Sequence, residues 1–201
     1  GPFDSKFTIE QAFTDIEAFR VDMAELNRQQ VNLKRGLSIF DIDQSNSKEL
    51  EQLESDLNYL EKCWNYTKSW QDMWAAWEGS TFGTLVTDKM EIEAGEIYKQ
   101  VTRLGREIKD KNWYILDETR NTILQFQRTM PLIVMLKNEA MRDRHWLQIK
   151  TEVAGGKMEP REIFDETADT FTLGKIIELK LDTFEEIINE VSGAASKELS
   201  I

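Results

Sequence analysis

The feature that most constrains this chain is a missing residue type: no proline occurs between Phe3 and Met130. The 201 residues include 3 prolines, at positions 2, 131 and 160, and 10 glycines. Folds built only of β-strands need frequent turns, and turns are rich in these two residue types. The sequence therefore predicts an all-α fold with long helices.

The charge balance is acidic, with 25 Lys and Arg against 37 Asp and Glu, which gives a net charge of −12. Nucleic-acid binding needs a basic face, so no nucleic-acid partner is expected. No run of about 18 apolar residues occurs, so no membrane partner is expected either. One cysteine, Cys63, excludes an internal disulfide and favours a reducing, cytoplasmic compartment.

The N-terminus carries no basic and apolar secretory signal and no initiator Met. Residues 1–2, Gly1-Pro2, resemble the scar that a processing protease leaves on a cloned protein. We therefore expect the chain to be an expressed piece of a longer protein.

Apolar residues recur at alternating steps of three and four, the spacing of one helical face. The first helix is expected to start at the capping box Thr8-x-x-Gln11 and to end near Gly36. Its stripe consists of Ile9, Ala12, Ile16, Phe19, Met23, Leu26, Leu33 and Leu37. Such a helix packs its stripe along a neighbour.

The second helical segment carries two stripes, which predicts neighbours on both sides. One has heptad spacing: Leu50, Leu53, Leu57, Leu60, Trp64 and Thr67. The other consists of Tyr59, Cys63, Tyr66, Trp70, Trp74 and Trp77. Aromatic residues at helical spacing are usually core, and Cys63 is expected to be a buried small hydrophobe. Trp70, Trp74 and Trp77 are nevertheless candidates for an interface with a larger protein.

A third helix is expected to open at Asp88-x-x-Glu91. Its stripe is Met90, Ala94, Ile97, Val101, Leu104 and Ile108, and the pattern resumes with Leu116, Thr119, Ile123, Phe126 and Met130. The sequence leaves open whether one helix runs through or breaks near Asn112. Because Pro131 disfavours helical geometry at the preceding residue, we expect an end there and a new helix at 132–136.

The remaining chain is predicted to hold shorter helices. Asn138 is expected to cap a helix from Glu139 to about Lys150. Residues 151–172 are expected to form a connection with a short helix near 161–164, followed by a helix at 173–181. The last helix is predicted to start at the Asp182-x-x-Glu185 capping pattern and to bury Ile188, Val191 and Ala195 in a stripe from Phe184 to Leu199.

Three features of the sequence resemble parts of chemical motifs, but in each case residues that the motif requires are missing. Gly156-Lys157 lacks the upstream Gly and the following Ser or Thr of a phosphate-binding loop. Asp165-Glu166-x-x-Asp169 resembles a magnesium motif, yet no second acidic motif accompanies it, so a solvated loop is preferred. His145 is the only histidine and cannot form a two-imidazole site. We therefore predict no catalytic, cofactor-binding or metal-binding residue and no cofactor.

The segment from Met130 to Trp146, MPLIVMLKNEAMRDRHW, resembles a signature of dynein heavy chains. That pattern reads approximately Leu-Pro-Leu-Ile, two variable residues, Leu-Lys, then Ala-Leu/Met-Arg-x-Arg-His-Trp. It departs at Met130, where Leu is commoner, and at Glu139, where Pro is often found. Phe171-Thr-Leu-Gly174 and the last helix resemble the next block. The resemblance covers about residues 110–201 and is more similar to axonemal than to cytoplasmic dyneins.

The resemblance implies a mechanical, non-catalytic role in the helical linker that precedes the ring of ATPase modules. In this family the linker is a curved arm whose bend and docking follow ATP binding and hydrolysis, so that the tail moves along microtubules. Residues 3–87 would form a neck or early-linker bundle, and residues 88–201 the N-terminal linker segment. The full-length parent would be a microtubule-stimulated ATPase in the axoneme of a cilium or flagellum. Expected partners are the ring and downstream linker of the same chain, with dynein tail subunits as a further option.

We expect an elongated, rod-like bundle of long antiparallel helices. The alternative function is a stand-alone spectrin-like cytoskeletal scaffold. The cluster Arg142, Arg144, His145 and Trp146 either locks the short helices, through ion pairs and a cation–π contact with Trp146, or contacts another domain. Gly155 and Gly156 lie in one candidate hinge, within residues 151–160, and residues 109–112 form another.

Overall fold

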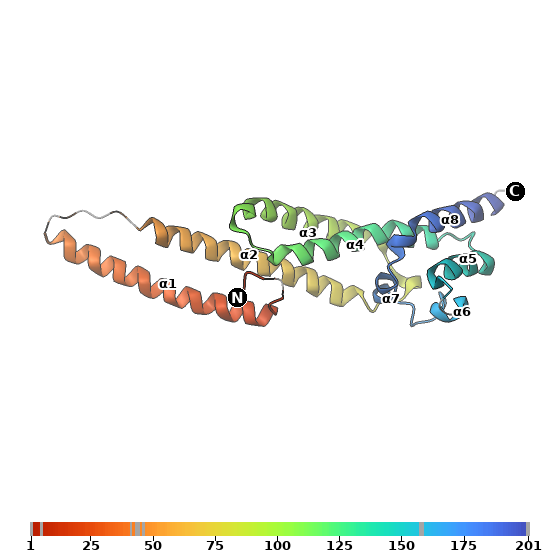
Figure 1. The fold of residues 1–201 in the computed structure, drawn as a ribbon, viewed down its shortest axis with the longest axis horizontal. Coiled ribbons are helices and arrows are strands. Elements are labelled where there is room, and N and C mark those ends of the chain that lie inside the picture. The colour runs from red at the N-terminus through yellow and green to blue at the C-terminus, as the bar shows by residue number, and fades with distance from the viewer. Residues whose placement is uncertain are drawn as a thin grey trace. The chain divides into compact units, whose positions relative to one another are not determined.

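The structure is a computed structural model that describes residues 2–4, 6–40, 42, 45, 47–156 and 159–199. Its elements are α1 (Ile9–Ser38), α2 (Lys48–Trp77), η1 (Phe82–Thr84), α3 (Thr87–Glu107), η2 (Lys109–Lys111), α4 (Ile115–Leu136), α5 (Asp143–Ala154), α6 (Pro160–Ile163), α7 (Leu173–Glu178), η3 (Leu181–Phe184) and α8 (Glu185–Leu199), shown in Figure 1. Within the described ranges, β-pairing is limited to one isolated bridge, between Thr81 and Thr172. The predicted all-α class is confirmed. Gly1 of the expected cloning scar, Lys157 of the Gly156-Lys157 pair and Ile201 lie outside the described residues.

The chain divides into two compact units. Unit 1 comprises residues 1–69 and 100–119, and unit 2 comprises residues 70–99 and 120–201. No helix in the ranges that the structure describes is long and apolar enough to cross a bilayer.

Helix α1 begins at the predicted capping box. The Thr8 hydroxyl accepts the Gln11 N–H at 3.2 Å, and the Gln11 side chain accepts the Thr8 N–H at 3.4 Å. The helix runs two residues past Gly36, to Ser38. In unit 1, α1 lies antiparallel to α2, where Arg20 pairs with Glu61 (Figure 1).

The apolar stripe of α1 is buried only in its first half. Ala12, Ile16 and Met23 are buried, but Phe19 between them is 42% exposed, and Leu26 and Leu33 are 44% and 55% exposed. The predicted packing along a neighbour is therefore incomplete towards the C-terminal end of α1.

The stripes of the next three helices are buried largely as predicted. Every predicted stripe residue of α3 and of the α4 segment up to Met130 is buried. On α2, Leu57, Leu60, Trp64 and Thr67 are buried, but Leu53 is 52% exposed. Cys63 is buried as expected, and its burial raises the pKa of the thiol to about 12.

The helix pattern does break near Asn112. After η2, Asn112 adopts left-handed geometry with φ +53°, which Asn tolerates better than most residues. Lys111 fixes this corner within unit 1. It pairs with Asp56, and its ammonium lies 5.6 Å from the Tyr59 ring centroid and 5.5 Å from that of Trp113.

The expected helix end at Met130 is wrong, because α4 continues through Pro131 to Leu136. Proline removes one helical hydrogen bond and clashes with the preceding turn. Here its neighbours compensate, since Met130, Leu132 and Ile133 are almost fully buried while Pro131 itself faces solvent. Burial of these side chains outweighs the local preference.

Asn138 does not cap a helix at Glu139, and α5 begins only at Asp143. The Asn138 Oδ1 accepts the N–H of Ala140, two residues on, at 3.0 Å. This Asx turn competes with the helical cap, which would bond a later N–H.

The C-terminal elements differ from expectation mainly at their ends. Helix α6 lies near its predicted place, and α7 stops at Glu178 rather than Leu181 because Lys180 is left-handed, with φ +52°. Asp182 falls in η3, so it does not cap α8, which starts at Glu185.

Candidate functional site

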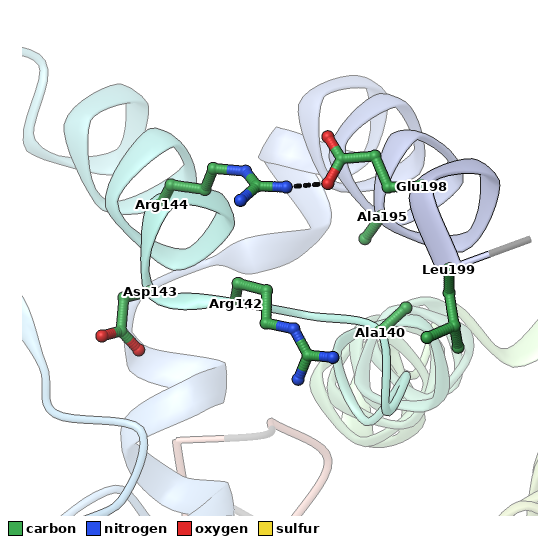
Figure 2. Close-up of a pocket in the computed structure, with 7 residues that line it drawn as sticks. All are labelled: Ala140, Arg142, Asp143, Arg144, Ala195, Glu198 and Leu199. Atoms are coloured by element: carbon green, nitrogen blue, oxygen red, sulfur yellow. Dashed lines mark hydrogen bonds and ion pairs between the residues drawn. The ribbon is translucent and has the colours of Figure 1, made fainter. Parts of the chain in front are cut away.

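The Arg142–Trp146 cluster lies in unit 2, at the start of α5 and beside α8. An open groove of about 730 Å³ lies there, and Figure 2 shows the residues that line it. It is lined by Ala140, Arg142, Asp143, Arg144, Ala195, Glu198 and Leu199. We call this place the α5–α8 junction.

Asn138 joins the α4–α5 connection to α8. Its side-chain amide Nδ2 donates to the Ser196 hydroxyl at 2.7 Å and to the Ser192 carbonyl at 3.2 Å. The Ser192 hydroxyl in turn donates to the Met135 carbonyl, at 3.0 Å, on the last turn of α4. Sequence reasoning missed this role, because the i, i+4 pair of serines gave no chemical signal of its own.

His145 is buried and uses both ring nitrogens. Its Nδ1 accepts the backbone N–H of Arg142 at 3.1 Å, so the chain is held in the first turn of α5. Its Nε2 lies 3.5 Å from the Glu198 carboxylate. Burial, followed by the positive charges of Arg144 and Arg142, lowers the pKa of His145 below its usual 6.5. The neutral ring therefore accepts at Nδ1 and carries its proton at Nε2.

The two arginines of the cluster behave differently. Arg144 pairs with Glu198 on α8, the dashed contact in Figure 2. Arg142 points away from Glu198, and its guanidinium has no ion pair or hydrogen bond to the part of the chain that the structure describes. The pair joins two helices, whereas Arg142 leaves a cation exposed in the groove.

Trp146 is buried in an aromatic cluster of unit 2. Its ring meets Phe82 edge to face at 5.8 Å and Phe164 at 6.3 Å. Phe171 stacks on Phe164 at 4.6 Å, with 9° between the planes. The expected cation–π contact with Trp146 does not occur among the described residues, and edge-to-face aromatic packing takes its place.

Gly174, in the Phe171-Thr-Leu-Gly174 motif, has a structural reason to be glycine. Its N–H donates to the Glu78 carbonyl at 2.9 Å, next to the Thr81–Thr172 bridge. A Cβ at position 174 would lie 3.3 Å from that carbonyl oxygen, closer than nearly all side chains tolerate. The motif thus joins the end of α2 to the start of α7.

In the acidic segment that resembled a magnesium motif, Asp165 and Glu166 bond to other residues of the same chain. Asp165 accepts the N–H and hydroxyl of Thr167 at 3.0 and 2.7 Å. These bonds lower its pKa. Glu166 pairs with the largely buried Lys150, whose ammonium also lies 5.0 Å from the Phe164 ring. Across the described ranges, no three His, Cys, Asp or Glu side chains are placed to hold a metal ion.

The three tryptophans of α2 gather around Phe126 of α4, within unit 2. Trp77 stacks on Phe126 at 5.4 Å, and Trp70 meets it edge to face at 5.5 Å. Trp70 is buried and donates to the Thr122 hydroxyl at 3.0 Å, while Trp74 and Trp77 are half-buried.

The glycine pair ends α5. Gly155 and Gly156 both have positive φ, +54° and +72°, and the Gly155 N–H donates to carbonyls of the last turn. This is the left-handed C-cap for which glycine is favoured.

The fold and this junction define the chain as a helical structural module. The side chains described above pack helices together or bond one helix to another. Residues 50–201 match the family described as "Dynein heavy chain, N-terminal region 2". The chain therefore belongs to the dynein heavy chain family, and the match extends further upstream than residues 110–201, which carry the sequence resemblance.

The chain aligns over all 201 residues with several curated dynein heavy chains. It is 41% identical to dynein axonemal heavy chain 2 of Mus musculus and 38% identical to that of Homo sapiens. It is 32% identical to the Dynein-1-beta heavy chain, flagellar inner arm I1 complex, of Chlamydomonas reinhardtii. The chain spans 4% of the length of each relative.

Proposed function

We propose that this chain is a non-catalytic mechanical element of a dynein motor. As neck and N-terminal linker helices, it couples ATP-driven changes in the motor ring to movement of the tail along microtubules. The family match to N-terminal region 2 carries the proposal. The buried stripes of α3 and α4 support it, because close-packed interiors transmit strain.

The names of the relatives support a place in the axoneme of a cilium or flagellum. The partners we propose are the ring and the downstream linker of the same heavy chain, together with tail subunits. ATP hydrolysis would belong to other parts of the heavy chain. The spectrin-like scaffold is not favoured, because residues 50–201 match dynein.

Within this role we propose that Arg144, His145 and Trp146 lock α5 in place. The ion pair to Glu198, the His145 bond to the Arg142 N–H and the aromatic packing of Trp146 all support a lock. Arg142, whose guanidinium pairs with none of the described residues, and the half-buried Trp74 and Trp77 are better suited to contacts with other domains.

Melting temperatures test the lock. Arg144→Ala and Trp146→Ala, separately and together, should lower the melting temperature of the chain, with Trp146→Ala the larger effect because it leaves a cavity. Arg103→Ala, which removes an exposed ion pair within α3, is the matched control. An unchanged melting temperature in the double variant would exclude the lock.

We propose that Gly155 and Gly156 form a hinge, and this proposal is tested in the full-length heavy chain. Gly155→Ala with Gly156→Ala should alter microtubule gliding and spare basal ATP turnover. Because alanine is strained at positive φ, the same positions should also be changed to Asn, which tolerates that geometry. Normal gliding in the Ala variant would count against the hinge.

A further inference from the structure

The C-terminal end of α1 has features that packing does not explain. The helix ends at Ser38, which is exposed, and Ile39 and Phe40 follow it at 78% and 74% exposed. Gly36 lies in this last turn, and a Cβ there would meet no atom within 4 Å. Space therefore does not require glycine at position 36, and its effect is to weaken the helical turn.

The sequence across this end is Lys34-Arg35-Gly36-Leu37-Ser38. An arginine three residues before a hydroxyl, followed by an apolar residue, is the charge pattern that basic-directed Ser/Thr kinases select. No other Ser or Thr of the 201 residues has Arg at this position.

Lysine precedes three other Ser or Thr residues by the same spacing, but the structure disfavours the two that it describes. The Thr102 hydroxyl is buried within α3. Thr183 is exposed, but it lies in η3, which the fully buried Leu181 holds against the core, so this segment cannot open easily. Ser200 lies outside the described residues. Ser38 is thus distinguished by its arginine and by the exposed residues that follow it.

The contacts at Ser38 leave its recognition groups available. The Arg35 side chain is exposed, and its guanidinium makes no ion pair with any described residue. The Ser38 hydroxyl donates to the Arg35 carbonyl at 2.8 Å, a bond within the last turn that opening the turn would release. Kinases bind the acceptor segment extended, so this turn must open. Opening it breaks the Ser38 bond and the bond from the Phe40 N–H to the Leu37 carbonyl at 3.0 Å, but no buried side chain of residues 38–40 has to move.

We propose that Ser38 is a phosphorylation site for a Ser/Thr protein kinase that selects arginine three residues before the acceptor. The Ser38 Oγ attacks the γ-phosphorus of Mg-ATP, the Oγ–P bond forms as the bond to ADP breaks, and the hydroxyl proton passes to the kinase's base. The added charge lies at the negative end of the helix, so it weakens the last turn of α1. This inference goes beyond the mechanical role and is independent of it.

The test uses the folded 201-residue chain, Mg-ATP and the catalytic subunit of cAMP-dependent protein kinase, with phosphate located by peptide mass spectrometry. The expected result is one phosphate per chain, on Ser38. Ser38→Ala should abolish it, Arg35→Ala should slow it about tenfold or more, and Ser45→Ala, an exposed control without arginine, should leave it unchanged.

A second comparison tests the role of the helix end. Gly36→Ala should slow phosphorylation of the folded chain, because it strengthens the last turn, and should leave a peptide of residues 31–42 unaffected. No phosphate on the folded chain, whether or not the peptide reacts, would overturn the proposal. Equal phosphorylation of the Ser38→Ala variant would do the same.

Discussion

Asn138 shows how much of the α5–α8 junction depends on a single side chain. Its Oδ1 forms the turn to Ala140, and its Nδ2 reaches Ser192 and Ser196 on α8. A sequence rule for helix caps recognised the residue but assigned it the wrong partner. Local rules compare bonds near in sequence, whereas the deciding partners here lie more than 50 residues away.

Asn138→Ala should therefore destabilise the chain. It removes the turn and leaves hydroxyl and carbonyl groups of α8 without their partner, a loss of about 1–3 kcal/mol. Denaturant unfolding monitored by circular dichroism measures it. Glu139→Ala, an exposed neighbour, should stay within about 0.5 kcal/mol of wild type; similar losses in both variants would contradict the account.

His145 should make stability depend on pH. Because burial and two arginines lower its pKa in the folded chain, the unfolded chain takes up a proton at higher pH. Stability from this residue is complete above the ordinary pKa of about 6.5 and is lost as pH falls below it. Protonation also removes the Nδ1 acceptor from the Arg142 N–H.

The measurement is the free energy of unfolding between pH 7.5 and pH 5.5, a window chosen around the ordinary pKa of about 6.5. Wild type should lose stability across it, and His145→Asn should lose less. Since His145 is the only histidine, no other imidazole contributes to the difference. The same pH slope in both proteins would contradict the assignment.

At the scale of whole elements, periodic burial was predictable and breaks were not. The stripes of α3 and α4 repeat over several turns, so the spacing of each apolar residue supports the same buried helical face. All of these stripe residues are buried up to Met130. Pro131 gave a strong local stop signal, yet α4 passes through it because burial on both sides outweighs it. The break at Asn112 was undecided, because its anchor, Asp56, lies on another helix.

Pro131→Ala should stabilise the chain. The substitution restores a helical N–H and relieves the clash in α4, while the exposed ring gives up little packing, so a gain of about 1–3 kcal/mol is expected. Thermal or denaturant unfolding measures the gain.

Pro160→Ala is the matched control for this substitution. Pro160 occupies the first turn of α6, where proline is favourable, so its replacement should bring no gain. A loss of stability in Pro131→Ala would contradict the account, because it would show that Pro131 does not destabilise α4.

At the scale of the molecule, an all-α class followed from few prolines and long stripes, and the family followed from a short signature. The junction could not be predicted as a whole. Its residues come from the α4–α5 connection, α5 and α8, and nothing in their spacing shows that Glu198 would face both Arg144 and His145.

The predicted elongated array is tested by solution scattering. A compact domain of 201 residues has a radius of gyration of about 16–17 Å. We propose that the chain gives a clearly larger value, because α1 and α2, at 30 residues each, are each about 45 Å long. A value of about 16–17 Å would contradict the rod-like expectation.

The central claim, that this segment transmits force without hydrolysing ATP, is tested most directly in the full-length heavy chain. ATP turnover and stall force should be measured together for wild type, for Arg144→Ala with Trp146→Ala, and for the Arg103→Ala control. The account predicts normal turnover with a reduced stall force in the double variant alone. Turnover and force falling in proportion, or a double variant identical to wild type in both, would contradict it.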